Sequence, residues 1–217
     1  MLEIHIKKKS FMSKIILQDI NIIILKNGIY GVVGKNGEGK TTLFKCLTGL
    51  TTFQGSISYN DFPLKNNDIA FIPTEVPIYN ELTLMEFSDF YRELLNLKNK
   101  NIENLFDVPD NKLIKAFSTG MKKKAYMNAV FQKEYTVYIF DEPFNGLDLE
   151  SNYLLMNYIR ELSKTSVVFI SSHILELLYK DCDSIFLVKN TKIQEFEKFQ
   201  YSIIEEELFL NAKKKRI

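Results

Sequence analysis

The chain is poor in several features that would assign it to a common class of protein. Its two cysteines, Cys46 and Cys182, are too few for a disulfide framework, and neither belongs to a CxxC or Cys/His metal-binding pattern. Its 28 basic and 27 acidic residues leave a net charge of +1. Such a balance produces no overall field that would attract nucleic acid or an anionic membrane. We therefore expect reduced thiols, as in cytosolic proteins, and the charge indicates no partner.

Long apolar runs are also missing. A helix that spans a bilayer needs about 20 consecutive, mostly apolar residues. The Ile-rich run Ile15–Leu25 is shorter than this, and Gln18, Asp19 and Asn21 interrupt it. The start of the chain, MLEIHIKKKS, has no apolar stretch behind a basic segment, which a secretory signal would show. The sequence therefore predicts a cytoplasmic chain that does not insert into a membrane by itself.

What the chain does contain is enough apolar material for one folded domain, since 46% of its 217 residues are hydrophobic and 25% are charged. Short runs rich in β-branched and aromatic residues recur along it and predict strands. These runs are Leu2–Ile6, Ile29–Val33, Ile57–Tyr59, Ile69–Ile72, Thr136–Phe140, Val167–Ile170 and Ser184–Val188. GIYGVV, TVYIF and SVVFI are apolar almost throughout, which is typical of strands buried on both faces. The sequence predicts an α/β fold with a mixed sheet flanked by helices, and an N-terminal antiparallel β piece.

A helical segment interrupts this pattern between residues 76 and 135. TLMEFSDFYRELLNLK has apolar residues at helical spacing, and MKKKAYMNAVFQKE predicts a second helix. The polar stretch Lys98–Lys112 predicts a connector with a short turn at IENLF. We therefore expect a core made of residues 1–75 and 136–190, an inserted helical subdomain at 76–135, and a C-terminal hairpin, helix and solvated basic tail at 191–217.

One glycine-rich segment has a clear chemical meaning. Residues Gly34–Thr41 fit the pattern GxxxxGK[ST] and lie between the strand IYGVV and the predicted helix TTLFKCLTGL. Phosphate oxygens must be approached by consecutive backbone N–H groups, which requires glycines, and a helix N-terminus adds partial positive charge. Lys40 would neutralise the β- and γ-phosphates, and the Thr41 hydroxyl would bind Mg²⁺. The segment therefore predicts a site for a nucleoside triphosphate.

Two carboxylates and a histidine follow buried strands. Asp141 ends the strand TVYIF, where open α/β sheets bind ligands, and would complete the Mg²⁺ site. Glu142 comes next and could activate a water that attacks the γ-phosphate, which favours hydrolysis over transfer to another substrate. His173, just after SVVFI, is either structural or a sensor of the γ-phosphate, and its position alone does not decide. His5, inside the first strand, is expected to be structural.

Five motifs occur in an order and approximate spacing that resemble those of ATP-binding-cassette (ABC) ATPases. They are Gly34–Thr42, Phe117–Met121, Asp141–Pro143, Asn145–Asp148 and His173. The resemblance covers essentially the whole chain from Leu2 to about Val188, and five ordered motifs are far more specific than any one of them. It implies a P-loop NTPase core that uses ATP and Mg²⁺.

The resemblance also implies a role for each matching residue of the nucleotide site. ATP would be held by Gly34, Asn36, Gly37, Gly39, Lys40, Thr41 and Thr42. The metal would be held by Thr41 and Asp141, and the catalytic roles would fall to Lys40, Glu142 and His173. Phe11 resembles the aromatic residue that stacks on adenine.

Three further residues resemble those that act between subunits in this family. Ser118 and Gly120 resemble the signature motif, which caps the γ-phosphate held by the other subunit of a head-to-tail dimer. The residues themselves support an anion site, because Ser-Thr-Gly before MKKKAYMNAVFQ is typical of a helix N-cap. Asp148 resembles the aspartate that contacts the partner across the interface.

The sequence departs from the family pattern in three places. FSTGM stands where LSGGQ is usual and resembles members with an SxGM form, so Ser118 and the backbone N–H groups should still cap a phosphate. Thr74 replaces the glutamine that links Mg²⁺ to the transport partner, and threonine is too short to reach as glutamine does; Glu75 is a candidate substitute. The segment between Leu97 and the signature is shorter than expected, so we expect the helical subdomain to have a reduced docking surface.

The resemblance implies the ATPase subunit of an ABC transporter, working as a homodimer or heterodimer on a separate transmembrane permease at the cytoplasmic face of the membrane. FSTGM and LTLMEF are similar to segments of exporters, which favours export. An alternative is a soluble ABC ATPase that acts on nucleic acid or the ribosome. The near-zero net charge and the absence of a heptad array argue against it. A nucleotide kinase or GTPase is weaker still, because Asn111–Ile114 lacks the aspartate of the NKxD pattern.

Overall fold

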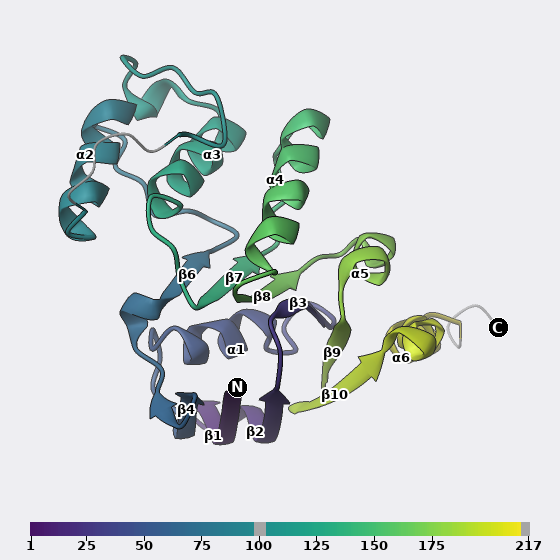
Figure 1. Ribbon diagram of the computed structural model, residues 1–217. Coiled ribbons are helices and arrows are strands. Elements are labelled where there is room, and N and C mark those ends of the chain that lie inside the picture. Colours follow the sequence, from purple (N-terminus) through teal and green to yellow (C-terminus); the bar gives the residue numbers. More distant parts are fainter. Residues whose placement is uncertain (98–102, 214–217) are drawn as a thin grey trace.

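The computed structural model describes residues 1–97 and 103–213, with side chains as far as residue 209. Within these residues a mixed sheet has the strand order β10-β9-β3-β8-β7-β6 and is parallel except for β10 (Figure 1). Its strands are β3 (Gly28–Val33), β6 (Ile69–Ile72), β7 (Val137–Asp141), β8 (Val167–Ser171), β9 (Ser184–Lys189) and β10 (Lys192–Glu197). Every residue of β3, β7 and β8 is buried, so the prediction of strands covered on both faces is confirmed.

A second, antiparallel sheet has the order β2-β1-β4-β5 and lies beside the first. Its strands are β1 (Leu2–Phe11), β2 (Lys14–Ile24), β4 (Gln54–Tyr59) and β5 (Phe62–Pro63). β1 continues past the predicted end at Ile6 through a lysine-rich stretch. It can do so because its backbone still pairs there, with Lys8 opposite Gln18 of β2 and Gln54 of β4.

Helices cover both faces of the mixed sheet. They are α1 (Lys40–Leu47), α2 (Leu84–Leu94), α3 (Thr119–Val130), α4 (Leu149–Leu162), α5 (Leu175–Asp181) and α6 (Tyr201–Lys213). Helix α1 lies between the two sheets (Figure 1), where Tyr30 and Val32 of β3 share its apolar cluster. Ile29 and Val33 point the other way, into a cluster with α3, α4 and α5. The fold is therefore the mixed α/β arrangement that the sequence predicts.

Helices α2 and α3 lie between β6 and β7 in the sequence and pack on each other, with the Tyr91 and Tyr126 rings 5.9 Å apart and nearly perpendicular. Helix α2 begins with a capping box, in which the Thr83 backbone N–H donates to Glu86 (2.8 Å) and the Glu86 N–H donates to the Thr83 hydroxyl (3.3 Å). Helix α3 begins at Thr119, two residues earlier than MKKKAYMNAVFQKE predicts, because Ser118 caps it.

Two predicted features fall partly outside the described residues. The first is the expected connector, of which residues 98–102 are not described. The described part of the connector, from residue 103 on, contains no helix before the short 3₁₀ turn Ile114–Ala116. The second is the basic tail, of which residues 214–217 are not described. No helix in the described part of the chain is both long and apolar enough to span a membrane.

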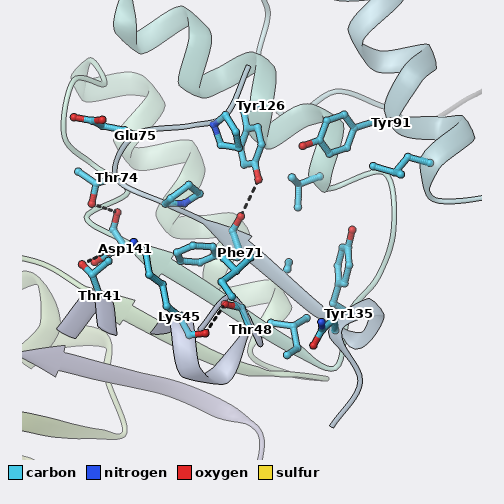
Figure 2. A pocket seen from close by; sticks show the side chains of 18 residues that line it. Thr41, Lys45, Thr48, Phe71, Thr74, Glu75, Tyr91, Tyr126, Tyr135 and Asp141 are labelled. Carbon is cyan, nitrogen blue, oxygen red and sulfur yellow. Dashed lines mark hydrogen bonds between the residues drawn. The ribbon is translucent and has the colours of Figure 1, made fainter. Parts of the chain in front are cut away.

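A cavity of about 910 Å³ opens between the mixed sheet and helices α2 and α3 (Figure 2). Aromatic side chains from three elements line it, including Phe71, Tyr91 and Tyr126. The Tyr126 hydroxyl donates to the Phe71 carbonyl (3.1 Å) and so joins α3 to the end of β6. One end of the cavity is lined by Thr41 and Asp141, so it reaches the predicted metal site.

Candidate nucleotide-binding site

The glycine-rich loop between β3 and α1 forms a tight cradle. Gly39 is the N-cap of α1 and has φ 112°, a conformation that side chains other than glycine rarely adopt. A Cβ at this position would lie 2.9 Å from Ile16 Cγ2. Lys40 folds back over the loop, and its Nζ donates to the carbonyls of Gly34 (2.6 Å) and Lys35 (3.4 Å). Burial lowers the pKa of Lys40. The nearby carboxylates oppose that shift, and Glu142 opposes it most strongly.

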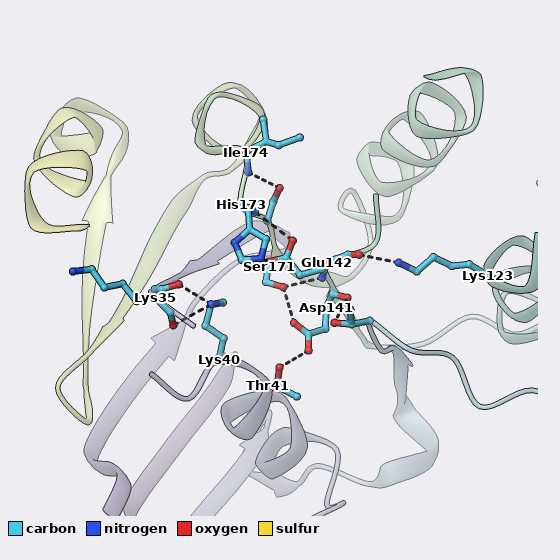
Figure 3. Close-up of polar contacts among 12 residues, drawn as sticks. Lys35, Lys40, Thr41, Lys123, Asp141, Glu142, Ser171, His173 and Ile174 are labelled. Carbon is cyan, nitrogen blue, oxygen red and sulfur yellow. Dashed lines mark hydrogen bonds and ion pairs between the residues drawn. The ribbon is translucent and has the colours of Figure 1, made fainter. Parts of the chain in front are cut away.

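Thr41 and Asp141 meet across the site. The Thr41 hydroxyl donates to Asp141 Oδ2 (2.7 Å), and the Ser171 hydroxyl donates to Asp141 Oδ1 (2.7 Å) (Figure 3). These residues come together because β7 and β8 run parallel with Asp141 directly opposite Ser171. A hydroxyl and a carboxylate oxygen at this separation, with their free lone pairs at the end of a phosphate loop, fit the oxygen ligands that Mg²⁺ prefers.

Glu142 is held in an unusual conformation beside this pair. Its φ is 52°, in the left-handed region, which costs a non-glycine residue about 1–3 kcal/mol unless its surroundings hold it. The Glu142 backbone N–H donates to the Ser171 hydroxyl (2.9 Å), and Oε2 accepts from the His173 backbone N–H (3.3 Å). The side chain is nearly buried, and this burial raises the pKa of Glu142, although His173 and Lys40 counteract it.

The other carboxylate oxygen of Glu142 has spare capacity. Oε1 lies 3.1 Å from His173 Nε2, within ion-pair distance. Oε1 is nevertheless buried, and no donor in the described part of the chain makes a hydrogen bond to it. A buried acceptor of this kind, with a raised pKa, is suited to take a proton from a bound water.

A cavity of about 400 Å³ connects these groups. Most of the residues predicted for the nucleotide site line this cavity: Asn36, Gly37, Gly39, Lys40, Thr41, Thr42, Asp141, Glu142 and His173. Gly34 lines a neighbouring cavity of about 350 Å³ instead, on the side of the loop that faces α6. Phe11 does not line the 400 Å³ cavity; it lies half-exposed at the β1–β2 hairpin with Lys9 Nζ 4.2 Å from its ring centre. From β2, Ile16 reaches the cavity.

The three residues predicted to act between subunits lie together, away from that cavity. The Ser118 hydroxyl accepts from the Met121 N–H (3.2 Å) at the start of α3. Gly120 packs so closely on the loop after β7 that a Cβ would lie 2.4 Å from the Gly146 carbonyl oxygen. Asp148 caps α4 through the Ser151 N–H (2.8 Å) and pairs with Lys124 (2.7 Å), and that hydrogen bond holds its pKa well below the ordinary value.

Sequence reasoning missed several contributors. Ser171 bridges Asp141 and Glu142, and the signal available was a polar residue ending a buried strand. Thr74, which the sequence analysis did single out, donates to the Asp141 backbone carbonyl (3.2 Å) and lines both cavities, whereas Glu75 lines the 910 Å³ cavity. Lys123 is buried in α3 and donates to carbonyls of the loop after Asp141. No feature of the sequence around Lys123 distinguishes it from Lys122 and Lys124.

A glycine-rich loop at the N-terminus of a helix, with a threonine and a carboxylate meeting at the ends of parallel strands, defines a P-loop nucleotide-binding protein. A model of the ABC transporter family matches residues 17–145, more than half of the chain. The chain therefore belongs to this family, and as one of its ATP-binding subunits it binds ATP.

Individual relatives agree with the assignment. The lantibiotic transport ATP-binding protein SrtF of Streptococcus pyogenes is 32% identical over 97% of this chain and 96% of its own length. The ABC-type transporter ATP-binding protein EcsA of Bacillus subtilis is 31% identical over 82% of this chain and 79% of its own. A solved structure of an ATP-binding subunit of an ABC transporter superposes with a TM-score of 0.85 at 25% identity, covering 98% of this chain and 99% of that one.

Proposed function

We propose that the chain hydrolyses ATP and that two copies, or one copy and a related subunit, close around ATP to drive transport through a separate membrane-spanning permease. The observation that carries hydrolysis is the buried Oε1 of Glu142 next to the Thr41–Asp141 pair, an acceptor to which no group in the described residues donates a hydrogen bond. Transfer to another acceptor would need a second substrate site, whereas a water needs only this oxygen.

The remaining groups divide the work in a simple way. Lys40 would leave the carbonyls of its own loop and neutralise the β- and γ-phosphates. Bound Mg²⁺ would supply further positive charge to the same oxygens. His173 lines the same cavity with its Nε2 3.1 Å from Glu142 Oε1, and it would contact the γ-phosphate and hold the carboxylate in place. Catalysis of this kind rests on positioning and charge, because phosphoryl transfer needs little covalent work from the protein.

The test is steady-state ATP hydrolysis by the parent chain and by Glu142→Gln. The amide cannot accept the proton, so we expect kcat to fall by about 10²- to 10⁴-fold with little change in ATP affinity. Glu161→Gln is the matched control, because Glu161 is exposed near the end of α4 and, among the described residues, forms an ion pair with Lys164 alone. Hydrolysis by Glu142→Gln at the parental rate would show that Glu142 is not the base.

Dimer closure is supported by the position of Ser118 and Gly120, whose helix N-terminus is exposed and outside the chain's own nucleotide cavity. A helix N-terminus that is exposed and does not line the chain's own nucleotide cavity suits the ATP of a second subunit. ATP-dependent dimerisation of Glu142→Gln, measured by size-exclusion chromatography with light scattering, tests this. A Glu142→Gln chain that stays monomeric at saturating ATP would contradict it.

The permease is proposed to dock in the 910 Å³ cavity between the sheet and helices α2 and α3 (Figure 2). Its aromatic lining suits an apolar protein segment, and Thr74 connects it to Asp141 through a single hydrogen bond. That route replaces the longer glutamine of other family members. The direction is proposed to be export, supported by the resemblance of FSTGM and LTLMEF to exporter segments.

A further inference from the structure

A lysine is buried beside the proposed base and donates to backbone carbonyls. Lys123 of α3 has 3% of its surface exposed, and its Nζ donates to the backbone carbonyls of Glu142 (2.8 Å) and Asn145 (3.2 Å). No carboxylate in the described part of the chain forms an ion pair with it. Burial lowers the pKa of Lys123 to about 8, with Glu142 and Asp141 opposing the shift. Burying an ammonium group costs free energy unless it is paired with an opposite charge and hydrogen-bonded. The retention of Lys123 at this position therefore calls for a functional explanation.

Those contacts hold the peptide groups of Glu142 from both sides. The Ser171 hydroxyl accepts from the Glu142 N–H (2.9 Å), and Lys123 donates to the Glu142 carbonyl (Figure 3). The same carbonyl receives the Asn145 N–H at 3.4 Å, so the ammonium closes a turn that begins at Glu142. Because Glu142 has φ 52°, its backbone needs such support to keep its carboxylate aimed at the site.

Lys123 also belongs to a wider attachment of α3 to the loop after β7. Gly120 packs against the Gly146 carbonyl, and Lys124 pairs with Asp148 (2.7 Å). Together with Lys123, these contacts span residues 142–148 of that loop. The N-terminal turns of α3 and the backbone of Glu142 therefore form one connected unit.

We infer that Lys123 is a positioning residue for ATP hydrolysis: it sets the orientation of Glu142 and joins that residue to the helix whose N-terminus would meet the partner's ATP. The inference rests on the proposed function, since it assigns Glu142 as the base. Through Lys123, a movement of the α3 N-terminus would be transmitted directly to the proposed base. If a partner's nucleotide displaced the helix, the Lys123 side chain would move the Glu142 carbonyl with it.

The test compares Lys123→Met, which keeps the length of the side chain but loses both hydrogen bonds to the loop, with Lys123→Gln, which keeps an amide donor. Lys122→Met is the matched control on the same helix, since Lys122 donates to Asn80 (2.7 Å) and not to the loop. For Lys123→Met we expect kcat for ATP hydrolysis to fall about 10- to 100-fold, as for a misplaced reacting group, with KM for ATP within about threefold of the parent. Lys123→Gln should recover part of kcat, because it can bond one carbonyl.

Two results would overturn the inference: a Lys123→Met chain with parental kcat, or a rise in its KM that matches the fall in kcat. If Lys123→Met does not fold, as judged by circular dichroism, Lys123→Gln decides alone; a reduced kcat at parental KM supports the inference and a parental kcat refutes it. Measuring the parent chain in the same assay distinguishes failure of the proposed function from failure of the role assigned to Lys123. A parent that binds ATP without hydrolysing it would contradict the proposed function, whereas an active parent with insensitive Lys123 variants would contradict only the role of Lys123.

Discussion

Gly120→Ala sets two physical effects against each other at the junction of α3 and the loop after β7. Alanine is the better helix former by up to about 1 kcal/mol, so propensity alone predicts a more stable protein. The new Cβ, however, would lie 2.4 Å from the Gly146 carbonyl oxygen, about 1 Å closer than the 3.4 Å at which ordinary contact begins. The obstacle is backbone, which cannot rotate away as a side chain can. Helix α3 and the loop must therefore separate.

The separation has a cost in stability and a larger one in activity. Overpacking of a close contact costs about 1–3 kcal/mol, so even if the full gain in propensity of about 1 kcal/mol is realised we expect a net loss of up to about 2 kcal/mol in the free energy of unfolding. A shift of about 1 Å would also stretch the Lys123 bond to the Asn145 carbonyl, now 3.2 Å, past the hydrogen-bonding range. Misplacement on this scale lowers kcat by about 100-fold.

Urea unfolding followed by circular dichroism and steady-state ATP hydrolysis measure the two effects separately. Thr119→Ala is the control, because this exposed neighbour gains helix propensity while the substitution adds no atom next to the loop. It should be at least as stable as the parent. A Gly120→Ala chain that gains stability and keeps its kcat would refute the argument, since the contact would then have relaxed without cost.

Three other perturbations have outcomes that follow from the site. Glu142→Gln should raise the melting temperature at pH 7, because a buried carboxyl whose pKa is raised penalises the folded state once it ionises. The gain should vanish as pH falls below the ordinary glutamate pKa of about 4.3, where the carboxyl is protonated in both states, and a gain that persists there in calorimetry would contradict this origin. Ser171→Ala should weaken Mg²⁺ binding by about 10- to 100-fold in a magnesium titration of ATP binding, because Asp141 loses the hydroxyl that orients it. Thr41→Val should weaken Mg²⁺ binding at least as much in the same titration, since it removes a proposed ligand; equal affinity would exclude the hydroxyl from the site.

Local patterns in the sequence were sufficient for much of the fold. The apolar runs GIYGVV, TVYIF and SVVFI predict strands buried on both faces, because only such strands have no polar side to present to water. The glycine-rich segment predicts a phosphate loop because its geometry depends on neighbouring residues along the chain. Ser118 likewise predicts a helix start through its own hydroxyl.

Helix and strand ends were less predictable where long-range pairing decides them. β1 extends through its polar lysines because two neighbouring strands hydrogen-bond to its backbone, which no property of those side chains indicates. The pair formed by Asp141 and Ser171 depends on the register between β7 and β8. Register is set by the packing of the whole sheet, so the bridge from Ser171 to Glu142 was invisible in the sequence.

The sequence by itself determined the class of fold, the phosphate loop and the candidate base, because these follow from composition, periodicity and residues close together in the chain. Only the tertiary structure decided which of three successive lysines lies beneath Glu142. Lys122, Lys123 and Lys124 are chemically equal, and the rotation of α3 against the loop after β7 sends one to Asn80, one to the carbonyls of Glu142 and Asn145, and one to Asp148. A helix turns about 100° per residue, so its packing orientation alone assigns such different environments to neighbours.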